Sequence, residues 1–376
     1  MNLLVAIDMA ACSNFAEALK MIWDSGDAAL PIDQRLPIES RRKLAAQLRA
    51  SSVIDKNFEL ISLSNAQPIE QGDALVIATS GSTGDSKGVV HTHDSIRAAV
   101  LATGERLECS KRDHWLACIS LAHVGGLSVV VRAMHYESTL SIIDRSDQSE
   151  IDYAIKSGAT MTSLVPTSLQ RLNVTGFRAV LIGGSRILGT LPPNAISTYG
   201  LTETMGGVVY DSQPLGGVEI KISDDSEIFI KAKSLLRCYR DGTDPKTSDG
   251  WLPTGDLGEM QDGKLAVHGR KDDLIKTGGF KVWPKSVEDV ILKIGGVSEC
   301  VVRGVPDEKW GSAVSAWIVL DRSRTSIDLE TVRSFVKQSL PDYCAPKTIT
   351  NVSEIPRTAL GKVRTAELLK LKALKT

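Results

Sequence analysis

The stretch that most restricts the possible folds of this chain has the letters V-I-A-T-S-G-S-T-G-D-S-K-G and ends at Gly88. An apolar run from Ala74 to Ala78 predicts a buried strand, and the hydroxyl- and glycine-rich turn after it predicts a loop. The glycines let the backbone approach an anion closely, the hydroxyls donate hydrogen bonds, and Lys87 supplies a compact positive charge. The pattern predicts a phosphate-binding loop, with an ordinary surface loop as the alternative. The turn consists of Thr79, Ser80, Gly81, Ser82, Thr83 and Gly84.

The size and charge of the chain favour an enzyme that acts on a small molecule. Its 376 residues suffice for two domains with large cores. The 44 Lys and Arg residues nearly balance the 45 Asp and Glu residues, so nothing indicates a nucleic-acid or membrane-surface partner. The N-terminus lacks a basic leader and no apolar run reaches the length of a membrane span, so we expect a cytoplasmic protein. The six cysteines show no metal-ligand spacing and are expected to be reduced and mostly buried.

Short apolar segments alternate with helical patterns and glycine-rich turns along the chain, which predicts an α/β fold with a parallel or mixed sheet. Before the phosphate loop, the residues from Leu30 to Pro37 predict an extended linker between two helices. After it, His123 follows an apolar strand and precedes two glycines and a helix. This histidine is either structural or part of a ligand crevice at a strand end. Arg132 lies among the valines of that helix, where it either extends to solvent or pairs with a buried anion.

The letters S-T-Y-G-L-T-E-T-M-G-G form a second motif. Its Tyr199 can stack on a purine, Thr202 can donate a hydrogen bond to a phosphate, and Glu203 can hold Mg²⁺ through hard oxygen ligands. The glycines at its end, Gly206 and Gly207, leave room for a substrate.

A third motif contains Asp256 in a glycine-flanked turn, where a carboxylate can accept two hydrogen bonds from the vicinal hydroxyls of a ribose. A plain Asx turn is the alternative. Fourteen residues later, Arg270 opens a charged R-K-D-D string, and the chain then restarts as a small domain. This change of composition predicts a domain boundary. The predicted domains are residues 1–270 and residues 271–376.

In this order, the motifs resemble those of the adenylate-forming superfamily, which includes acyl-CoA synthetases, adenylation domains of peptide synthetases and luciferases. Ser86 stands where the common P-loop has glycine, so the loop resembles this superfamily instead. The resemblance extends from Thr79 to Lys362, about three quarters of the chain. It implies a large N-terminal α/β domain of mixed sheets and helices, joined by a hinge to a small α+β C-terminal domain.

The resemblance also implies a role for each matched residue, with ATP, Mg²⁺ and the co-substrate coenzyme A (CoA) as ligands. The implied catalytic residues are Lys362, Glu203, Thr202 and His123, and Glu203 also holds the metal. Nucleotide binding is implied for the turn from Thr79 to Gly84, Lys87, Gly183, Gly184, Tyr199, Asp256, Arg270, Gly278 and Gly279. Substrate contact is implied for His123, Arg132, Gly206 and Gly207, and the hinge for Asp272.

Within the superfamily the chain is most similar to the o-succinylbenzoate-CoA ligases of menaquinone biosynthesis. In that branch the arginine at the position of Arg132 helps to bind a dicarboxylate. Only 78 residues precede the phosphate loop, and the stretch between Gly184 and Tyr199 is short. Because both regions shape the acyl pocket, the identity of the acid is what these departures leave open.

Three alternatives remain. The chain could be another acid-CoA ligase, for an aryl or short fatty acid. A free-standing peptide-synthetase adenylation domain is disfavoured because neither a substrate-ammonium aspartate nor a carrier domain is found. A nucleotide-binding regulator without turnover is disfavoured because Glu203 and Lys362 are both present. The expected partners are small molecules, with no nucleic acid and no membrane, and a homo-oligomer is possible.

Overall fold

The computed structural model describes residues 2–80, 86–144, 146–169, 171–185, 187, 189–321, 324–357 and 363–371. The chain folds into two compact units, of which the first consists of Met1–Ile220 and Ile230–Leu252 and the second of Lys221–Phe229 and Pro253–Thr376. The boundary predicted at residue 270 separates domains that are expected to rotate relative to each other during a reaction, and it stays a prediction.

The first sheet of the first unit has the order β16-β6-β5-β2-β1-β3-β4. Its strands are β1 Leu4–Ile7, β2 Ala28–Pro31, β3 Ser52–Ile54, β4 Leu60–Ser62, β5 Asp73–Ser80, β6 Ser86–Thr92 and β16 Cys238–Tyr239. Strand β1 lies parallel to β2 and β3, and β2 lies parallel to β5, whereas β5 and β6 form an antiparallel hairpin. The expected extended linker after residue 30 thus begins as a strand inside a sheet.

The second sheet of this unit has the order β13-β12-β11-β10-β9-β7-β8. Its strands are β7 His114–Ala117, β8 Thr139–Ile142, β9 Met161–Leu164, β10 Ala179–Ile182, β11 Ala195–Leu201, β12 Gly206–Tyr210 and β13 Gln213–Pro214. The five strands from β8 to β11 in this order are parallel, and β12 returns antiparallel to β11. The carboxyl ends of the parallel strands therefore meet at one edge, where α/β folds place their ligands.

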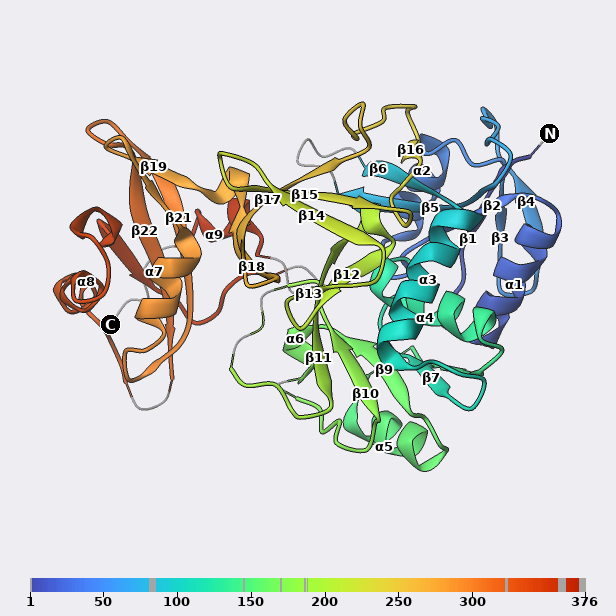
Figure 1. Cartoon of the computed structure of the whole chain (residues 1–376), viewed down its shortest axis with the longest axis horizontal. Coiled ribbons are helices and arrows are strands. Elements are labelled where there is room, and N and C mark those ends of the chain that lie inside the picture. Colours follow the sequence, from blue (N-terminus) through green and yellow to red (C-terminus); the bar gives the residue numbers. More distant parts are fainter. Residues whose placement is uncertain are drawn as a thin grey trace. The chain divides into compact units, whose positions relative to one another are not determined.

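Helices fill the layer between the two sheets and cover their outer faces (Figure 1). The helices are α1 Ser13–Asp24, α2 Ile38–Gln47, α3 His93–Leu107, α4 Val124–His135, α5 Gln148–Lys156 and the short α6 Pro166–Leu169. Apolar residues of α1, α3 and α4 pack between the sheets, while α2 covers the outer face of the first sheet and α5 that of the second. In α1 the buried positions Phe15, Ala18, Leu19 and Ile22 recur with the helical period, which fixes one face toward this core.

Helix α3 starts at a capping box directly after the hairpin. The Thr92 hydroxyl accepts a hydrogen bond from the Ser95 backbone N–H, and the Ser95 hydroxyl accepts one from the Thr92 N–H. The N-cap is thus Thr92, two residues before Asp94 and three before Ser95, which the local sequence favours as caps.

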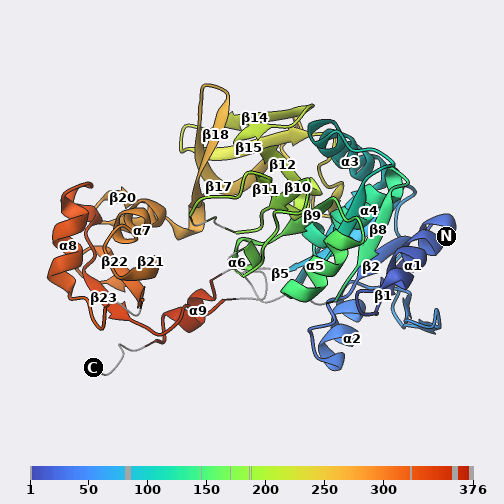
Figure 2. The same cartoon turned by 90° about the horizontal axis from the view of Figure 1, so that it is seen from below.

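The described residues from Val218 onward form three further sheets, and the first of these crosses the boundary between the two units. A four-stranded sheet has the order β14-β15-β17-β18, a two-stranded sheet pairs β19 with β20, and a three-stranded sheet has the order β21-β22-β23. These strands are β14 Val218–Ile222, β15 Glu227–Ala232, β17 Leu252–Gln261, β18 Lys264–Arg270, β19 Ile275–Thr277, β20 Phe280–Val282, β21 Val297–Asp307, β22 Gly311–Leu320 and β23 Thr348–Asn351. Helices α7 Pro284–Ile291 and α8 Leu329–Lys337 pack in one apolar core with β21 and β22, and α9 Thr365–Leu368 contributes to a second core on these strands (Figure 2). The α+β character of this part agrees with the expected fold.

All six cysteines are free thiols, and four of them are buried, as the sequence predicted. None of the helices in the described ranges combines the length and apolar character needed to span a bilayer.

The antiparallel pair β11–β12 brings two glycine backbones into contact. A Cβ atom on Gly200 would lie 1.9 Å from the carbonyl oxygen of Gly206, so no side chain fits there. We expect Gly200→Ala to lower the free energy of unfolding by about 1–3 kcal/mol or more, because the backbone must shift. Urea denaturation of the variant would measure this. The matched control is Gly295→Ala, where a Cβ would meet no atom within 4 Å; equal stability of the two variants would contradict the prediction.

Candidate functional site

The hairpin of β5 and β6 carries the residues on either side of the expected phosphate loop. Thr79 and Lys87 are cross-strand partners, and the Thr79 hydroxyl lies 3.4 Å from the Lys87 carbonyl oxygen. Ser80 is the last residue of β5. The Lys87 side chain is exposed, and its Nζ lies 4.9 Å from the ring centre of Tyr239. The expected loop residues Gly81, Ser82, Thr83 and Gly84 lie outside the described residues.

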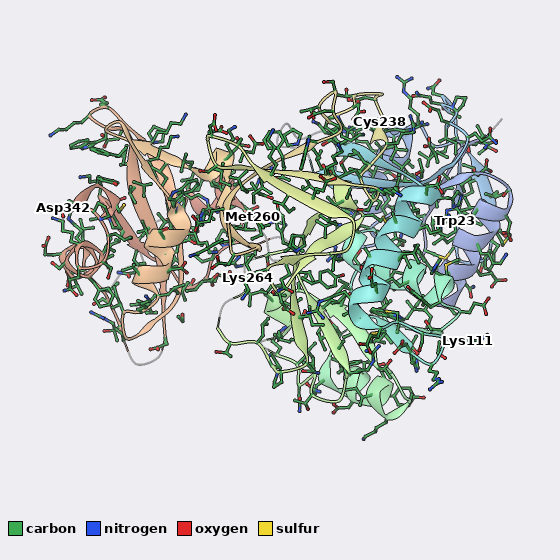
Figure 3. All side chains as sticks on the ribbon, viewed as in Figure 1. Trp23, Lys111, Cys238, Met260, Lys264 and Asp342 are labelled. Carbon is green, nitrogen blue, oxygen red and sulfur yellow. The ribbon has the colours of Figure 1, made fainter. Side chains whose placement is uncertain are left out.

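Tyr239 connects this lysine to the second motif. Strand β16, whose Cys238 is labelled in Figure 3, pairs with β6 so that Tyr239 lies opposite Val89. The Tyr239 hydroxyl donates a 3.0 Å hydrogen bond to Oε1 of Glu203. A cation, an aromatic ring and a carboxylate are therefore arranged in series. The sequence analysis missed Tyr239 because no motif surrounds it and its neighbours are distant in sequence.

The side chain of His91 contacts the backbone of the same motif at Thr202. It is fully buried on β6, and its Nε2 lies 2.7 Å from the carbonyl oxygen of Thr202. Because a carbonyl only accepts, Nε2 carries the proton, and Nδ1 lies 3.1 Å from the hydroxyl of Ser95. Burial lowers the pKa of His91 to about 4, although the hydrogen bond to Thr202 acts in the opposite direction. The sequence analysis missed this residue too, although a histidine within the run G-V-V-H-T was a usable signal.

Thr202 and Glu203 stand on the short 3-10 turn that follows β11, and both are half-buried. The backbone N–H of Leu236 donates a 2.8 Å hydrogen bond to the Glu203 carbonyl oxygen. The Glu203 position is therefore fixed by backbone and side-chain contacts from the segment next to β16. Within the described residues there is no cluster of three His, Cys, Asp or Glu that could hold a metal by itself. One carboxylate is, however, the set of protein donors that suits Mg²⁺ shared with substrate phosphates.

Glycines allow close backbone packing at the strand ends of the second sheet. Gly183 and Gly184 follow β10, and a Cβ on Gly183 would lie 2.3 Å from the hydroxyl of Thr198. Gly184 has φ +85°, a conformation that favours glycine. Tyr199 lies next to Thr198 on β11. These residues gather at the carboxyl edge of the parallel strands, where the sequence predicted the adenine site.

Gly206 and Gly207 begin β12; Gly206 faces helix α4, whereas a Cβ on Gly207 would lie 2.6 Å from the ring of Tyr210. A Cβ on Gly206 would lie 3.8 Å from Cγ2 of Val124 and 3.9 Å from the hydroxyl of Ser128. These two helix residues and Arg132 follow at intervals of four, so they share one face of α4.

Arg132 is buried, with 4% of its surface exposed, which excludes the alternative that it extends to solvent. Its Cζ lies 5.5 Å from the ring centre of Trp115 on β7. Among the described residues, its Nη1 has no hydrogen-bond partner. A buried guanidinium N–H without an acceptor is unfavourable, which is consistent with a site for an anion.

His123 is the residue before the first turn of α4 and is partly exposed. Its Nε2 lies 2.9 Å from Nη2 of Arg35 and 3.3 Å from Oδ2 of Asp33. Both partners belong to the turn after β2. The sequence analysis treated that turn as a linker and missed this contact.

The remaining predicted residues belong to the second unit. Asp256 on β17 and Arg270 on β18 are cross-strand partners, and Arg270 Nη1 donates 3.1 Å hydrogen bonds to Asp256 Oδ1 and to the Thr254 carbonyl oxygen. Gly278 and Gly279 form the turn between β19 and β20, both with positive φ. Asp272 lies on a 3-10 turn directly after β18. Lys362 lies outside the described residues, although its neighbour Val363 forms a bridge with Arg357.

Comparison with known proteins assigns the family. The sequence profile described as AMP-binding enzyme matches residues 17–239, more than half of the chain, and the profile described as AMP-binding enzyme C-terminal domain matches residues 286–362. The chain belongs to the family of AMP-binding enzymes. The two matched regions of this AMP-binding enzyme include every candidate site residue except those between Asp256 and Gly279.

Named relatives fall in one branch of the family. A 2-succinylbenzoate–CoA ligase of Listeria monocytogenes is 31% identical over 360 residues, covering 87% of this chain and 76% of the relative. A probable 2-succinylbenzoate–CoA ligase of Mycobacterium tuberculosis is 34% identical, covering 81% and 86%. Among solved structures, the o-succinylbenzoate CoA synthetase of Bacillus subtilis in complex with the acyl-adenylate OSB-AMP has a TM-score of 0.84 at 25% identity, covering 99% of this chain and 89% of that one. ATP-bound MatB of Rhodopseudomonas palustris, at 21% identity and a TM-score of 0.87, shares the fold.

Tyr239 donates a hydrogen bond to Glu203, so we expect removal of its hydroxyl to weaken the binding of Mg·ATP. Tyr239→Phe keeps the ring beside Lys87 but removes the hydrogen bond to the carboxylate, and a hydrogen bond to a charged group contributes about 1.5–3 kcal/mol. We expect the affinity for Mg·ATP, measured by titration calorimetry, to fall about tenfold or more. Affinity for AMP without metal should change little. Tyr153→Phe, an exposed position, is the control. Equal affinity of wild type and Tyr239→Phe for Mg·ATP would contradict the assignment of Glu203.

The buried state of His91 predicts how stability changes with pH. The unfolded chain binds a proton at His91 below its ordinary pKa of 6.5, whereas the folded chain does so only below about 4. The free energy of unfolding should therefore fall as the pH decreases from 6.5 to 4, and His91 should contribute up to about 3 kcal/mol of that fall. Urea denaturation between pH 4.5 and 7.5 would measure it, with His91→Gln for comparison. The same dependence on pH in both proteins would show that His91 is not the group responsible.

Proposed function

We propose that this chain is an acid-thiol ligase that joins o-succinylbenzoate to CoA through an acyl-adenylate, in menaquinone biosynthesis. Two observations support the proposal. Named relatives that match more than four fifths of this chain carry this activity in their names. The fold also matches a structure that contains the corresponding acyl-adenylate.

The observation that carries the choice of acid is the buried Arg132. An acid that reacts through its only carboxylate has no second anion, whereas a dicarboxylate reacts through one carboxylate and keeps the other. That second carboxylate needs a cation in the acyl pocket. Arg132 lies on the same face of α4 as Val124 and Ser128, which border Gly206. The buried Nε1 of Trp115, next to it, is a second N–H that has no partner among the described residues.

In the first half-reaction a carboxylate oxygen of the acid attacks the α-phosphorus of ATP, and the bond to pyrophosphate breaks. Lys87 and the hydroxyls from Thr79 onward bind the β- and γ-phosphates, and Thr202 donates to the α-phosphate. Lys362 lies between the incoming carboxylate and the α-phosphate and reduces their repulsion. Bound Mg²⁺ would supply further neutralisation of phosphate charge, and Glu203 is the residue that would hold it.

In the second half-reaction the sulfur of CoA attacks the acyl carbonyl carbon, the thiol proton is released, and AMP leaves. The small domain rotates about Asp272, which withdraws Lys362 and places the turn of Gly278 and Gly279 over the acyl-adenylate. Asp256 and Arg270 hold the ribose in both steps. We expect this reaction in the cytoplasm, with small molecules as the partners.

Pyrophosphate release tests the proposal. Wild type, Lys362→Ala and Arg132→Ala are incubated with Mg·ATP and one acid from a panel of o-succinylbenzoate, benzoate, hexanoate and several amino acids. We expect release with o-succinylbenzoate in the wild type. Lys362→Ala should lower the rate by at least about a hundredfold, since the positive charge that reduces the repulsion between the carboxylate and the α-phosphate is lost. Arg132→Ala should lower kcat/KM for o-succinylbenzoate by about a hundredfold, because one buried ion pair is lost.

Three controls separate the alternatives. Arg97→Ala, an exposed arginine of α3, should behave as wild type. Thermal unfolding and Arg132→Lys distinguish a lost contact from a misfolded pocket. Pyrophosphate release with a monocarboxylic acid, at the same rate in wild type and Arg132→Ala, would show that the chain is another acid-CoA ligase. Nucleotide binding without release for any acid would show a regulator that has kept the fold.

A further inference from the structure

The turn after β2 brings a charged pair to the start of helix α4. Arg35 donates to both carboxylate oxygens of Asp33, from Nε at 2.9 Å and from Nη2 at 2.6 Å. The same Nη2 lies 2.9 Å from Nε2 of His123, which is 88 residues further along the chain. Nη2 has two hydrogens, so it can donate to the carboxylate and to the imidazole together.

Several contacts keep this turn in place. Strand β2 is buried between β1 and β5, and it delivers the chain to Asp33. The Gln34 side chain donates to Oδ1 of Asp8 at 2.6 Å and to the Ile32 carbonyl oxygen at 3.2 Å. Arg41 donates to the same Asp8 and, at 2.7 Å, to Oε1 of Gln34. A network of this kind fixes the backbone from which Asp33 and Arg35 extend.

The geometry also assigns the proton on His123. A guanidinium only donates, so the contact with Arg35 requires Nε2 to accept, and the neutral ring then carries its proton on Nδ1. Burial opposes the ionisation of Asp33, but the hydrogen bonds from the side chain and backbone N–H of Arg35, together with its positive charge, outweigh burial and hold the pKa of Asp33 well below its usual range. Asp33 therefore stays charged and keeps Arg35 in the orientation that meets the imidazole.

His123 directly precedes Val124, whose Cγ2 lies 3.8 Å from the position that a Cβ on Gly206 would take. We propose that Asp33 and Arg35 are positioning residues that hold His123 at the entrance of the acyl pocket, and so help to determine which acid binds. This inference rests on the proposed function. It assigns a specific part in acid selection to the short N-terminal segment, which contains none of the family's nucleotide-binding motifs.

Steady-state pyrophosphate release with o-succinylbenzoate and Mg·ATP tests this. We expect Arg35→Gln to raise KM for the acid on the order of tenfold, because the imidazole loses a charged hydrogen bond. The KM for ATP should stay within about twofold, since no nucleotide contact is altered. Arg35→Lys and Asp33→Asn should lie between wild type and Arg35→Gln. The matched control is Arg42→Gln, an exposed arginine of α2 whose partner is Glu39.

A double variant separates positioning from general structure. If Arg35 acts through His123, Arg35→Gln in a His123→Ala background should change KM for the acid by less than about twofold. Three results would overturn the inference. They are an undiminished effect of Arg35→Gln on KM for the acid in the His123→Ala background, a rise of KM for ATP as large as that for the acid, and no effect of Arg35→Gln on KM for the acid. Absence of release by the wild type with every acid would instead reject the proposed function.

A second measurement does not depend on turnover. Nitrogen-15 NMR of the imidazoles should show His123 as the Nδ1–H tautomer in the wild type, with its signals assigned through His123→Ala. Arg35→Gln should change the tautomer ratio of His123. An Nε2–H tautomer in the wild type, or signals unaffected by Arg35→Gln, would overturn the inference whatever the enzyme activates.

Discussion

One buried hydrogen bond, from His91 to the carbonyl oxygen of Thr202, connects the two sheets at the site. His91 belongs to β6 of the first sheet, and Thr202 follows β11 of the second. His91 and Thr202 are 111 residues apart in sequence. The distance between the β5–β6 hairpin and the turn that contains Glu203 therefore depends on such long-range contacts. Because the imidazole is fully buried and neutral, the bond is not weakened by solvent, and an unpaired carbonyl in its place would be costly. The contacts of Leu236 and Tyr239 with Glu203 brace the same turn from a third segment.

Close backbone packing is a second feature of the strand ends in the second sheet. Where Gly200 meets Gly206 and Gly183 meets Thr198, the chain uses glycine because a Cβ would overlap with its neighbour. The backbones therefore approach one another there. Val124 and Ser128 of α4 lie closest to the Cβ position of Gly206, and Arg132, two turns beyond Val124 on the same helix, has a buried Nη1 without an acceptor among the described residues.

The sequence predicted what local patterns encode and missed what depends on distant pairings. The strand before the expected phosphate loop and the helix that contains Arg132 follow from local patterns. Asp256, by contrast, was expected in a turn and lies on strand β17 opposite Arg270, because the long-range pairing with β18 extends the strand through it. Likewise, β1 and β3 are short apolar or mixed segments whose strand state depends on parallel partners elsewhere in the chain. Tyr239 gains its importance from the pairing of β16 with β6, and Arg35 from its contact with His123. No periodicity within either segment could have indicated these partners.

The hinge that we propose at Asp272 would have a physical requirement. The 3-10 turn that contains Asp272 lies within the second compact unit, so rotation about it would separate β18 from α7. Contacts across this point include one hydrogen bond from Lys285 to the Val267 carbonyl oxygen and a tilted pair of the His268 and Trp283 rings. Both involve partly exposed side chains and contribute little each, as surface contacts do. Motion on the microsecond to millisecond scale that hinges allow is therefore compatible with the packing of this unit.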